Sequence, residues 1–144
     1  MKISDVIDRK GRVVARLLPT DTVERAVQLL AAQRIGAVMI EDRWQTLAGI
    51  FSERDLVRVL AAHGPAALSF ELHKVMTHNL IACHPSDSVD DMLGVMTMNK
   101  IRHLPVLEHG RLTGIVSIGD LVNYRLTEKQ QEAAVLLEIS RMRA

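Results

Sequence analysis

The spacing of apolar residues changes in a fixed order along the first half of the chain. Residues 23–30 have the i, i+3, i+4, i+7 pattern of a helix that buries one face: Val23, Ala26, Val27 and Leu30. Short apolar runs at 37–40 and 47–51 predict two strands joined by a polar turn at 41–46. An apolar stretch at 12–18 predicts one more strand before the helix.

Polar residues mark where the helices of this half begin. Asp21, followed three residues later by Glu24, predicts a capped start for the first helix. Ser52 and Asp55 predict the same kind of cap for a second helix, which we expect to end near His63. This half of the chain is therefore expected to fold as β-α-β-β-α.

The second half repeats this order. Residues 80–83 predict a strand, Asp87 begins a helix, 103–107 and 112–116 predict two strands, and Ser117 begins the last helix. The first of these helices carries Asp90 in its opening turn and buries one face: Val89, Met92, Leu93 and Met96. Each unit alone would bury too little surface, so we expect an α/β (α+β) fold of two pseudo-twofold repeats packed sheet to sheet.

The repetition extends to individual residues. Segment 49–55, Gly-Ile-Phe-Ser-Glu-Arg-Asp, returns 65 residues later as 114–120, Gly-Ile-Val-Ser-Ile-Gly-Asp, whereas Pro19 recurs as Pro85 at an offset of 66. A one-residue change inside a strand would turn every later side chain to the other face. The difference in length is therefore predicted to lie in the loop at 41–46.

Composition and charge narrow the classes of function. The 144 residues are 48% hydrophobic and 3% aromatic, with a formal net charge of +1. Few aromatic platforms and no basic block argue against nucleic-acid binding, and the lack of a long apolar run argues against a membrane. With no signal-peptide pattern and with Cys83 as its single cysteine, the protein is expected to be cytoplasmic.

Neither a metal site nor a catalytic centre is predicted. The six histidines lack the short paired spacing, with cysteines or carboxylates, that structural zinc sites use. No Ser/His/Asp order, carboxylate pair or Walker loop is present. We therefore expect neither a metal cofactor nor enzymatic activity.

The repeated Ser-x-x-Asp turn is the candidate binding chemistry. Ser52 and Ser117 begin helices whose backbone N–H groups and positive dipole end suit an anion such as phosphate. Asp55 and Asp120 follow one turn later, and a carboxylate can accept both hydrogen bonds of a ribose diol. The alternative is that each Ser-x-x-Asp is only a helix cap, but its duplication in matched context favours a binding role.

Several segments closely resemble the cystathionine β-synthase (CBS) domain. They are Pro-Ser-Asp-Ser-Val at 85–89, Ile-Arg-His-Leu-Pro-Val at 101–106 and Gly-Ile-Val-Ser-Ile-Gly-Asp-Leu at 114–121, with matches in the first half at 19–23, 35–38 and 49–56. The resemblance implies a tandem CBS pair, or Bateman module, of the stand-alone bacterial type. It divides the chain into repeat 1 with an N-terminal segment at 1–72, repeat 2 at 73–126 and a C-terminal helix at 127–144.

The same resemblance implies a regulatory module that binds adenosine nucleotides between its repeats and acts through the conformation of a homodimer. AMP is the ligand expected first, with ADP, ATP, NAD(H) and S-adenosylmethionine as further candidates. Asp55 and Asp120 would hold ribose, and Ser52 and Ser117 would approach ribose or phosphate. Adenine would contact apolar segments of the opposite repeat that include Val14, Arg16 and Ile81.

The resemblance also implies that the two sites are unequal. Arg102 and His103 stand where the first repeat has uncharged residues, and they favour a charged mononucleotide beside Asp120. In the first repeat the cation is Arg54, so that site could take the adenosine end of a dinucleotide or stay empty.

Residues 127–142 have the composition of a helix with an apolar stripe: Val135, Leu136, Ile139 and Met142. This helix either packs back on its own module or forms a dimer contact, and both alternatives are open from the sequence. A downstream protein partner is expected but not identified. A different class of function is also open, namely a structural dimerisation or docking module whose nucleotide clefts are vestigial.

Overall fold

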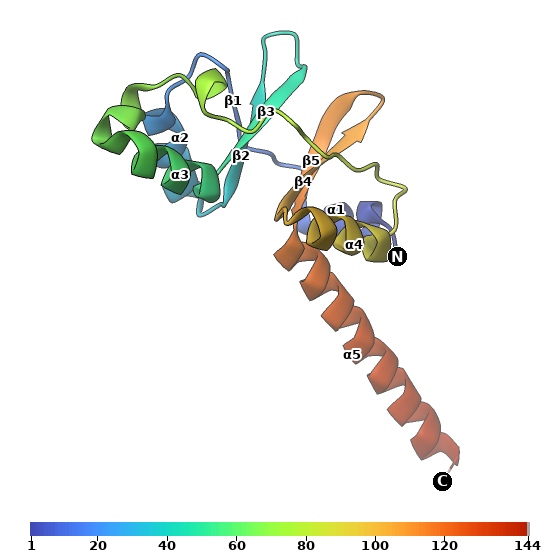
Figure 1. The fold of residues 1–144 in the computed structure, drawn as a ribbon. Coiled ribbons are helices and arrows are strands. Elements are labelled where there is room, and N and C mark those ends of the chain that lie inside the picture. The colour runs from blue at the N-terminus through green and yellow to red at the C-terminus, as the bar shows by residue number, and fades with distance from the viewer. Residues whose placement is uncertain (144) are drawn as a thin grey trace.

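The computed structural model describes residues 1–143 and shows an α+β fold of two lobes (Figure 1). The elements follow in the order α1 (Ile3–Lys10), β1 (Arg16–Leu17), α2 (Val23–Gln33), β2 (Ala37–Glu41), β3 (Leu47–Ser52), α3 (Glu53–His63), the 3-10 helices η1 (Gly64–Ser69) and η2 (Leu72–Lys74), α4 (Val89–Asn99), β4 (His103–Glu108), β5 (Arg111–Ser117) and α5 (Ile118–Arg143). This order confirms the duplicated helix, hairpin and helix that the sequence predicts.

The first lobe is a three-stranded sheet covered by helices on one face. β1 pairs parallel with β2, and β2 pairs antiparallel with β3. Val38, Ile40 and Phe51 turn one face of this sheet toward the helices, where they are fully buried. They pack there against Val23 and Ala26 of α2, so the helical spacing read from the sequence does bury this face.

The second lobe has a two-stranded sheet and takes a helix from the far N-terminal end of the chain. β4 pairs antiparallel with β5. The apolar face of α1 (Ile3, Val6 and Ile7) is buried with Val89 of α4 and Leu104 of β4. The N–H groups of Ile3 and Ser4 donate to the carbonyls of Asp87 and Pro85, both at 2.9 Å. The N-terminal segment therefore belongs to the first half of the sequence but packs in the core of the second lobe.

The other faces of the two sheets pack against each other. Ala37, Met39 and Ile50 of the first sheet share a buried cluster with Leu112 of the second. Arg16 also links the two sheets through polar contacts. Its guanidinium donates to the Leu112 carbonyl at 3.0 Å and pairs with Glu41. The predicted sheet-to-sheet arrangement is confirmed.

The strands predicted to open each repeat are much shorter than expected. Only Arg16–Leu17 of the 12–18 stretch pairs with β2, and in the 80–83 stretch Cys83 makes an isolated bridge to Val106. The chain before each of these points runs along the junction of the lobes without a continuous partner strand. An apolar run does not show that a neighbouring strand is present to pair with it, and within these two stretches only Leu17 and Cys83 are buried.

Two of the predicted helix caps are wrong by one residue. Thr22 rather than Asp21 caps α2, and Ser88 rather than Asp87 caps α4. The two aspartates instead accept backbone N–H groups three residues before them, from Leu18 at 2.7 Å and from His84 at 2.8 Å. The cap predicted at Ser52 is confirmed. The predicted length difference is also confirmed, because the hairpin loop at 42–46 is longer than the one at 109–110.

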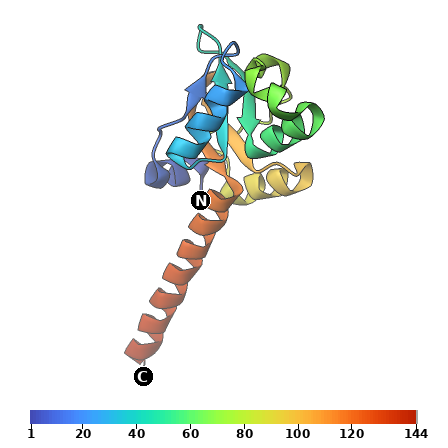
Figure 2. The same cartoon turned by 90° about the vertical axis from the view of Figure 1, so that its left-hand side faces the viewer.

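The last helix, α5, is continuous from Ile118 to Arg143 and leaves the body of the molecule (Figures 1 and 2). Leu121 is buried in the second lobe, whereas every residue from 129 to 143 is exposed. Val135, Leu136, Leu137, Ile139 and Met142 all lie in this exposed part. The alternative in which this segment packs back on its own module is therefore wrong in this structure.

The repeated glycines Gly49 and Gly114 each permit a close approach. A side-chain carbon at Gly49 would lie 2.8 Å from the carbonyl oxygen of Thr77 and 2.6 Å from the sulfur of Met76. At Gly114 it would lie 2.7 Å from Ile7 of α1. The glycine of each Gly-x-x-Ser-x-x-Asp turn therefore keeps room for a crossing segment.

We expect Gly49→Ala to lower the free energy of unfolding by about 1–3 kcal/mol, because the added methyl meets backbone that cannot move aside easily. Urea denaturation would measure this change. Gly94→Ala is the matched control, since nothing lies within 4 Å of a side-chain carbon at this exposed position in α4. Alanine should stabilise that helix by up to about 1 kcal/mol. Equal effects of the two substitutions would contradict the close-approach explanation.

Candidate functional site

Two cavities lie at the junction of the lobes, each built around one of the Ser-x-x-Asp turns. The Asp55 cavity has a volume of about 280 Å³ and the Asp120 cavity a volume of about 310 Å³. Gly36 and His103, which belong to different repeats, line both of them. The sheet packing thus brings the two predicted turns to neighbouring cavities.

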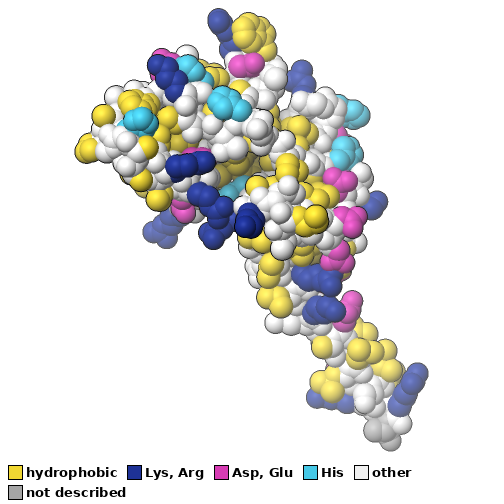
Figure 3. Space-filling view, viewed as in Figure 1, with side chains coloured by type: hydrophobic (Ala, Val, Ile, Leu, Met, Phe, Trp, Pro, Cys, Tyr) yellow, Lys and Arg dark blue, Asp and Glu magenta, His cyan; other side chains and the backbone are white. Residues whose placement is uncertain are grey.

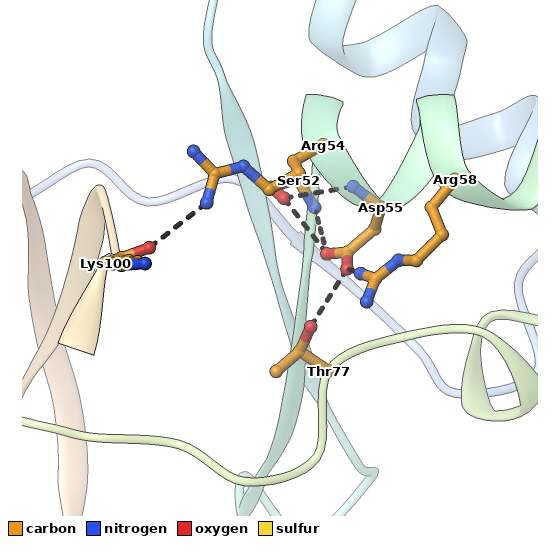
Figure 4. Close-up of polar contacts among 6 residues, drawn as sticks. All are labelled: Ser52, Arg54, Asp55, Arg58, Thr77 and Lys100. Atoms are coloured by element: carbon orange, nitrogen blue, oxygen red, sulfur yellow. Dashed lines mark hydrogen bonds and ion pairs between the residues drawn. The ribbon is translucent and has the colours of Figure 1, made fainter.

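The Asp55 carboxylate is buried and held by four donors (Figure 4). The Ser52 N–H and hydroxyl donate to Oδ2 at 2.8 and 3.0 Å. The Thr77 hydroxyl donates to Oδ1 at 2.9 Å, and the Arg58 guanidinium pairs with the same oxygen. Both carboxylate oxygens are therefore engaged within the protein, and only 3% of the residue's surface is exposed.

Basic side chains outnumber acidic ones around the Asp55 cavity: Arg54, Arg58, Lys100 and Arg102 against Glu53 and Asp55. The Arg54 guanidinium donates to the backbone carbonyl of Lys100 at 3.1 Å, which links the start of α3 to the end of α4. Figure 3 shows Lys and Arg side chains gathered at the hollow between the lobes. Such a surplus of positive charge suits an anionic ligand.

The Asp120 carboxylate is more accessible and is held differently. Lys10 Nζ donates to its Oδ2 at 2.5 Å, and the Ser117 N–H donates to the same oxygen at 2.8 Å. Lys10 also donates to the Ile115 carbonyl at 3.0 Å. Within residues 1–143 both of these hydrogen bonds to the carboxylate reach Oδ2, and 28% of the side chain is exposed.

Burial by itself would raise the pKa of Asp120. The hydrogen bonds from Lys10 and Ser117 outweigh burial and hold the pKa below the ordinary value of 3.8. The carboxylate is therefore ionised at neutral pH.

The helix starts offer fewer free amides than the sequence suggests. The first N–H of α3, from Glu53, donates to the Gly36 carbonyl at 3.0 Å, and that of α5, from Ile118, donates to the Arg102 carbonyl at 2.9 Å. The third N–H of each helix bonds to the hydroxyl of its capping serine. The amides at the first and third positions of each helix are therefore already paired within the protein, so the attraction of an anion falls mainly to basic side chains.

His103 separates the two cavities. A side-chain carbon at Gly36 would lie 3.1 Å from its ring nitrogen Nε2, so the ring packs closely on the facing backbone. Burial lowers the pKa of His103 below its ordinary value of 6.5, and the nearby charge of Lys10 lowers it further. The ring is therefore mostly neutral at pH 7 and presents a polar wall to both cavities.

Other predicted site residues occupy positions that differ from the expectation. Arg102 lines the Asp55 cavity and not the Asp120 cavity beside which it was expected. Neither cavity is lined by Val14, Arg16 or Ile81. In the extended segment before β1, alternate side chains face opposite ways, so Val13 and Ala15 line the Asp120 cavity instead.

Several residues that line these cavities were not predicted, among them Lys10, Arg34, Arg58, Thr77 and Lys100. Arg58 was detectable, because it stands three residues after Asp55 on a predicted helix. Lys10 ends a helix whose apolar spacing is visible at Ile3, Val6 and Ile7, but its partner is 110 residues away. No local pattern connects residues at that separation.

No helix within residues 1–143 is both long and apolar enough to cross a membrane. In the same range no group of three or more His, Cys, Asp or Glu residues is placed to hold a metal ion.

Comparison with known proteins identifies the class to which this pair of lobes belongs. Residues 3–62 and 72–127 match the CBS domain, one match in each half, and the chain belongs to the CBS domain family. CBS-domain pairs are in general regulatory modules rather than catalytic ones. The resemblance read from the sequence is confirmed.

Individual relatives support the same assignment. The chain is 34% identical over 138 residues to a mitochondrial CBS domain-containing protein of Arabidopsis thaliana, covering 90% of this chain and 67% of the relative. A CBS-domain containing protein from Agrobacterium tumefaciens superposes with a TM-score of 0.84 at 41% identity, covering 87% of this chain and 99% of the other. A CBS domain protein from Pyrobaculum aerophilum, solved in complex with AMP, superposes with a TM-score of 0.75 at 25% identity, covering 83% and 89%.

The lowered pKa of Asp120 predicts how its contribution to stability depends on pH. A carboxyl group whose pKa is lower in the folded state stabilises the fold above its unfolded-state pKa, and this contribution is lost as the pH falls through the folded-state pKa. Asp120→Asn should therefore lower the free energy of unfolding by about 1 kcal/mol at pH 7. The difference from the wild type should shrink as the pH falls below the unfolded-state value, near 3.8.

Urea titrations of both proteins at pH 7 and at about pH 3 would measure this change. Asp8→Asn is the control, because Asp8 lies outside both cavities and pairs with the exposed Arg12. A difference for Asp120→Asn that stays constant across this range would contradict the role of the ionised carboxylate.

Proposed function

We propose that the protein binds adenosine nucleotides in the Asp55 and Asp120 cavities and that occupancy regulates a partner. The observation that carries the proposal is the placement of a Ser-x-x-Asp turn in each of two adjoining cavities formed by both repeats. The AMP complex of the Pyrobaculum aerophilum relative supports the choice of ligand class. In each cavity the aspartate would accept hydrogen bonds from the two hydroxyl groups of the ribose diol, and basic side chains would attract the phosphate.

The distribution of charge supports unequal ligands. The Asp55 cavity has four basic and two acidic side chains along its wall, a formal surplus of two positive charges. The Asp120 cavity has Lys10 and Arg34 with Asp120, a formal surplus of one. A ligand with more phosphate charge, such as ADP or ATP, is therefore proposed for the Asp55 cavity, and AMP for the Asp120 cavity.

The regulatory step is proposed to be a change in how the two repeats, or two copies of the chain, sit against each other. His103 and Gly36 touch across both cavities, so a ligand that fills either cavity contacts both repeats. A ligand shifts such an arrangement only if it binds one arrangement more tightly than the other. The free energy by which a ligand can shift the arrangement is limited by that difference in affinity.

Substituting the two aspartates separately would test the binding sites. Asp120→Ala should weaken binding in the Asp120 cavity by about tenfold or more, because a charged hydrogen-bond partner of ribose is lost, while the other site is retained. Asp55→Ala should have the converse effect. Calorimetry with AMP, ADP, ATP, NAD, NADH and S-adenosylmethionine would measure affinity and stoichiometry, after a thermal-shift screen of the same compounds.

Asp8→Ala serves as the surface control and should leave both sites unchanged. If no adenosine compound binds the wild-type chain, the nucleotide proposal fails. If binding occurs but neither aspartate substitution changes it, the ribose assignment fails.

A second candidate function, dimerisation or docking, is favoured by the exposed part of α5. Val135, Ile139 and Met142 form one apolar face at i, i+4 and i+7, with Leu136 beside it, and these side chains are between 41% and 83% exposed. Such a face is costly to leave in water. We propose that it packs against a second copy of the chain, so that the regulatory form is a homodimer.

Substituting this face should abolish the dimer. The wild-type chain should have a mass of about 32 kDa by light scattering, twice the chain mass of 16.0 kDa. Val135→Glu with Ile139→Glu should give the monomer mass, because two charges would be buried in the contact. Ala134→Glu is the matched control on the polar side of α5, between Glu138 and Arg141 in helical projection. A monomeric wild-type protein, or a dimeric double variant, would contradict this contact.

A further inference from the structure

Each aspartate proposed to bind ribose is already paired with a basic side chain on the wall of its own cavity. Lys10 pairs with Asp120, and Arg58 pairs with Asp55. A ribose diol that takes over either carboxylate has to displace this cation. The displaced charge then needs another partner.

The two cations come from unrelated parts of the fold. Arg58 stands one turn after Asp55 on α3, and its counterpart in the second repeat, 65 residues later, is the uncharged Asn123. The Asp120 cavity receives its cation instead from Lys10, the last residue of α1. Duplication of the repeat therefore does not explain why both aspartates have a basic partner.

Both basic side chains are placed so that they can move without unfolding their surroundings. The Lys10 side chain is 35% exposed and is followed by Gly11, whose φ of 103° ends α1. The Arg58 side chain is 68% exposed, although the carboxylate that it contacts is buried. Each of these side chains lines the same cavity as the aspartate that it pairs with.

We infer that Lys10 and Arg58 are exchangeable counter-ions, which leave the aspartate when ribose binds and pair with the phosphate of the same ligand. A neutral nucleoside breaks the ion pair and supplies no new anion, whereas a nucleoside phosphate supplies one. The cavities thereby select nucleoside phosphates over nucleosides. This inference rests on the proposed function, because it concerns the ligand class of the same two cavities.

The test compares AMP with adenosine, two ligands that differ only in the phosphate. The wild-type chain should bind AMP at least about tenfold more tightly than adenosine in calorimetry, a difference of about 1.4 kcal/mol. Lys10→Met should weaken the binding of AMP in the Asp120 cavity and strengthen the binding of adenosine there, since Asp120 is then free to bind ribose. Arg58→Met should have the same opposite effects in the Asp55 cavity.

Three further variants make the result specific. Lys10→Arg keeps the charge and should keep the preference for AMP. Lys10→Gln removes the charge but keeps a donor for Asp120, so it replaces Lys10→Met if the methionine variant lacks the wild-type circular dichroism spectrum. Lys129→Met removes a charge from an exposed position of α5, outside both cavities, and should change neither affinity.

The key outcome is the opposite change for the two ligands. Equal weakening of AMP and adenosine by Lys10→Met and by Lys10→Gln would overturn counter-ion exchange while leaving nucleotide binding intact, because those side chains would then only support the cavity. Equal affinity of the wild type for the two ligands would also overturn it. Absence of binding by both ligands to every variant would instead contradict the proposed function, and this inference with it.

Discussion

The contact between the two sheets is the constraint on which the binding region depends. Met39 and Ile50 of one repeat and Leu112 of the other are buried at this contact, and the helix starts lie at its edge. Removing this apolar surface from water holds together two repeats that are each too small to stand alone. It also places His103 of one repeat on Gly36 of the other, so that the two cavities share a wall.

Duplication of sequence has produced two cavities with matching carboxylates and different surroundings. Asp55 is buried and contacted by Arg58 and Thr77, whereas Asp120 is partly exposed and paired with Lys10 of α1. Because an ionised group responds to every nearby charge and donor, the same turn has different binding chemistry in each repeat. The two cavities are therefore expected to differ in their affinity for a ligand and in the ligand charge that they favour, although their backbone structure is similar.

Much of the fold was predictable from residue patterns. Helical spacing identified α2 and α4, apolar runs identified the two hairpins, and the offset change identified the longer loop. The predictions failed where two neighbouring residues compete to cap the same helix. Thr22 and Ser88 cap their helices because the neighbouring aspartates, Asp21 and Asp87, bond backward to the preceding turn. A sequence shows which residues are able to cap, but the backbone path decides which one does.

By itself, the sequence determined the duplicated turn, the CBS family and the two aspartates, because these depend on residue types at short and regular spacing. Only the tertiary structure decided that Arg102 faces the Asp55 cavity and that Lys10 pairs with Asp120 across 110 positions of the chain. Electrostatic interactions act through space over a few ångströms and are insensitive to separation along the chain. The partners of a charged group are therefore known only once the packing of the two lobes has brought distant segments together.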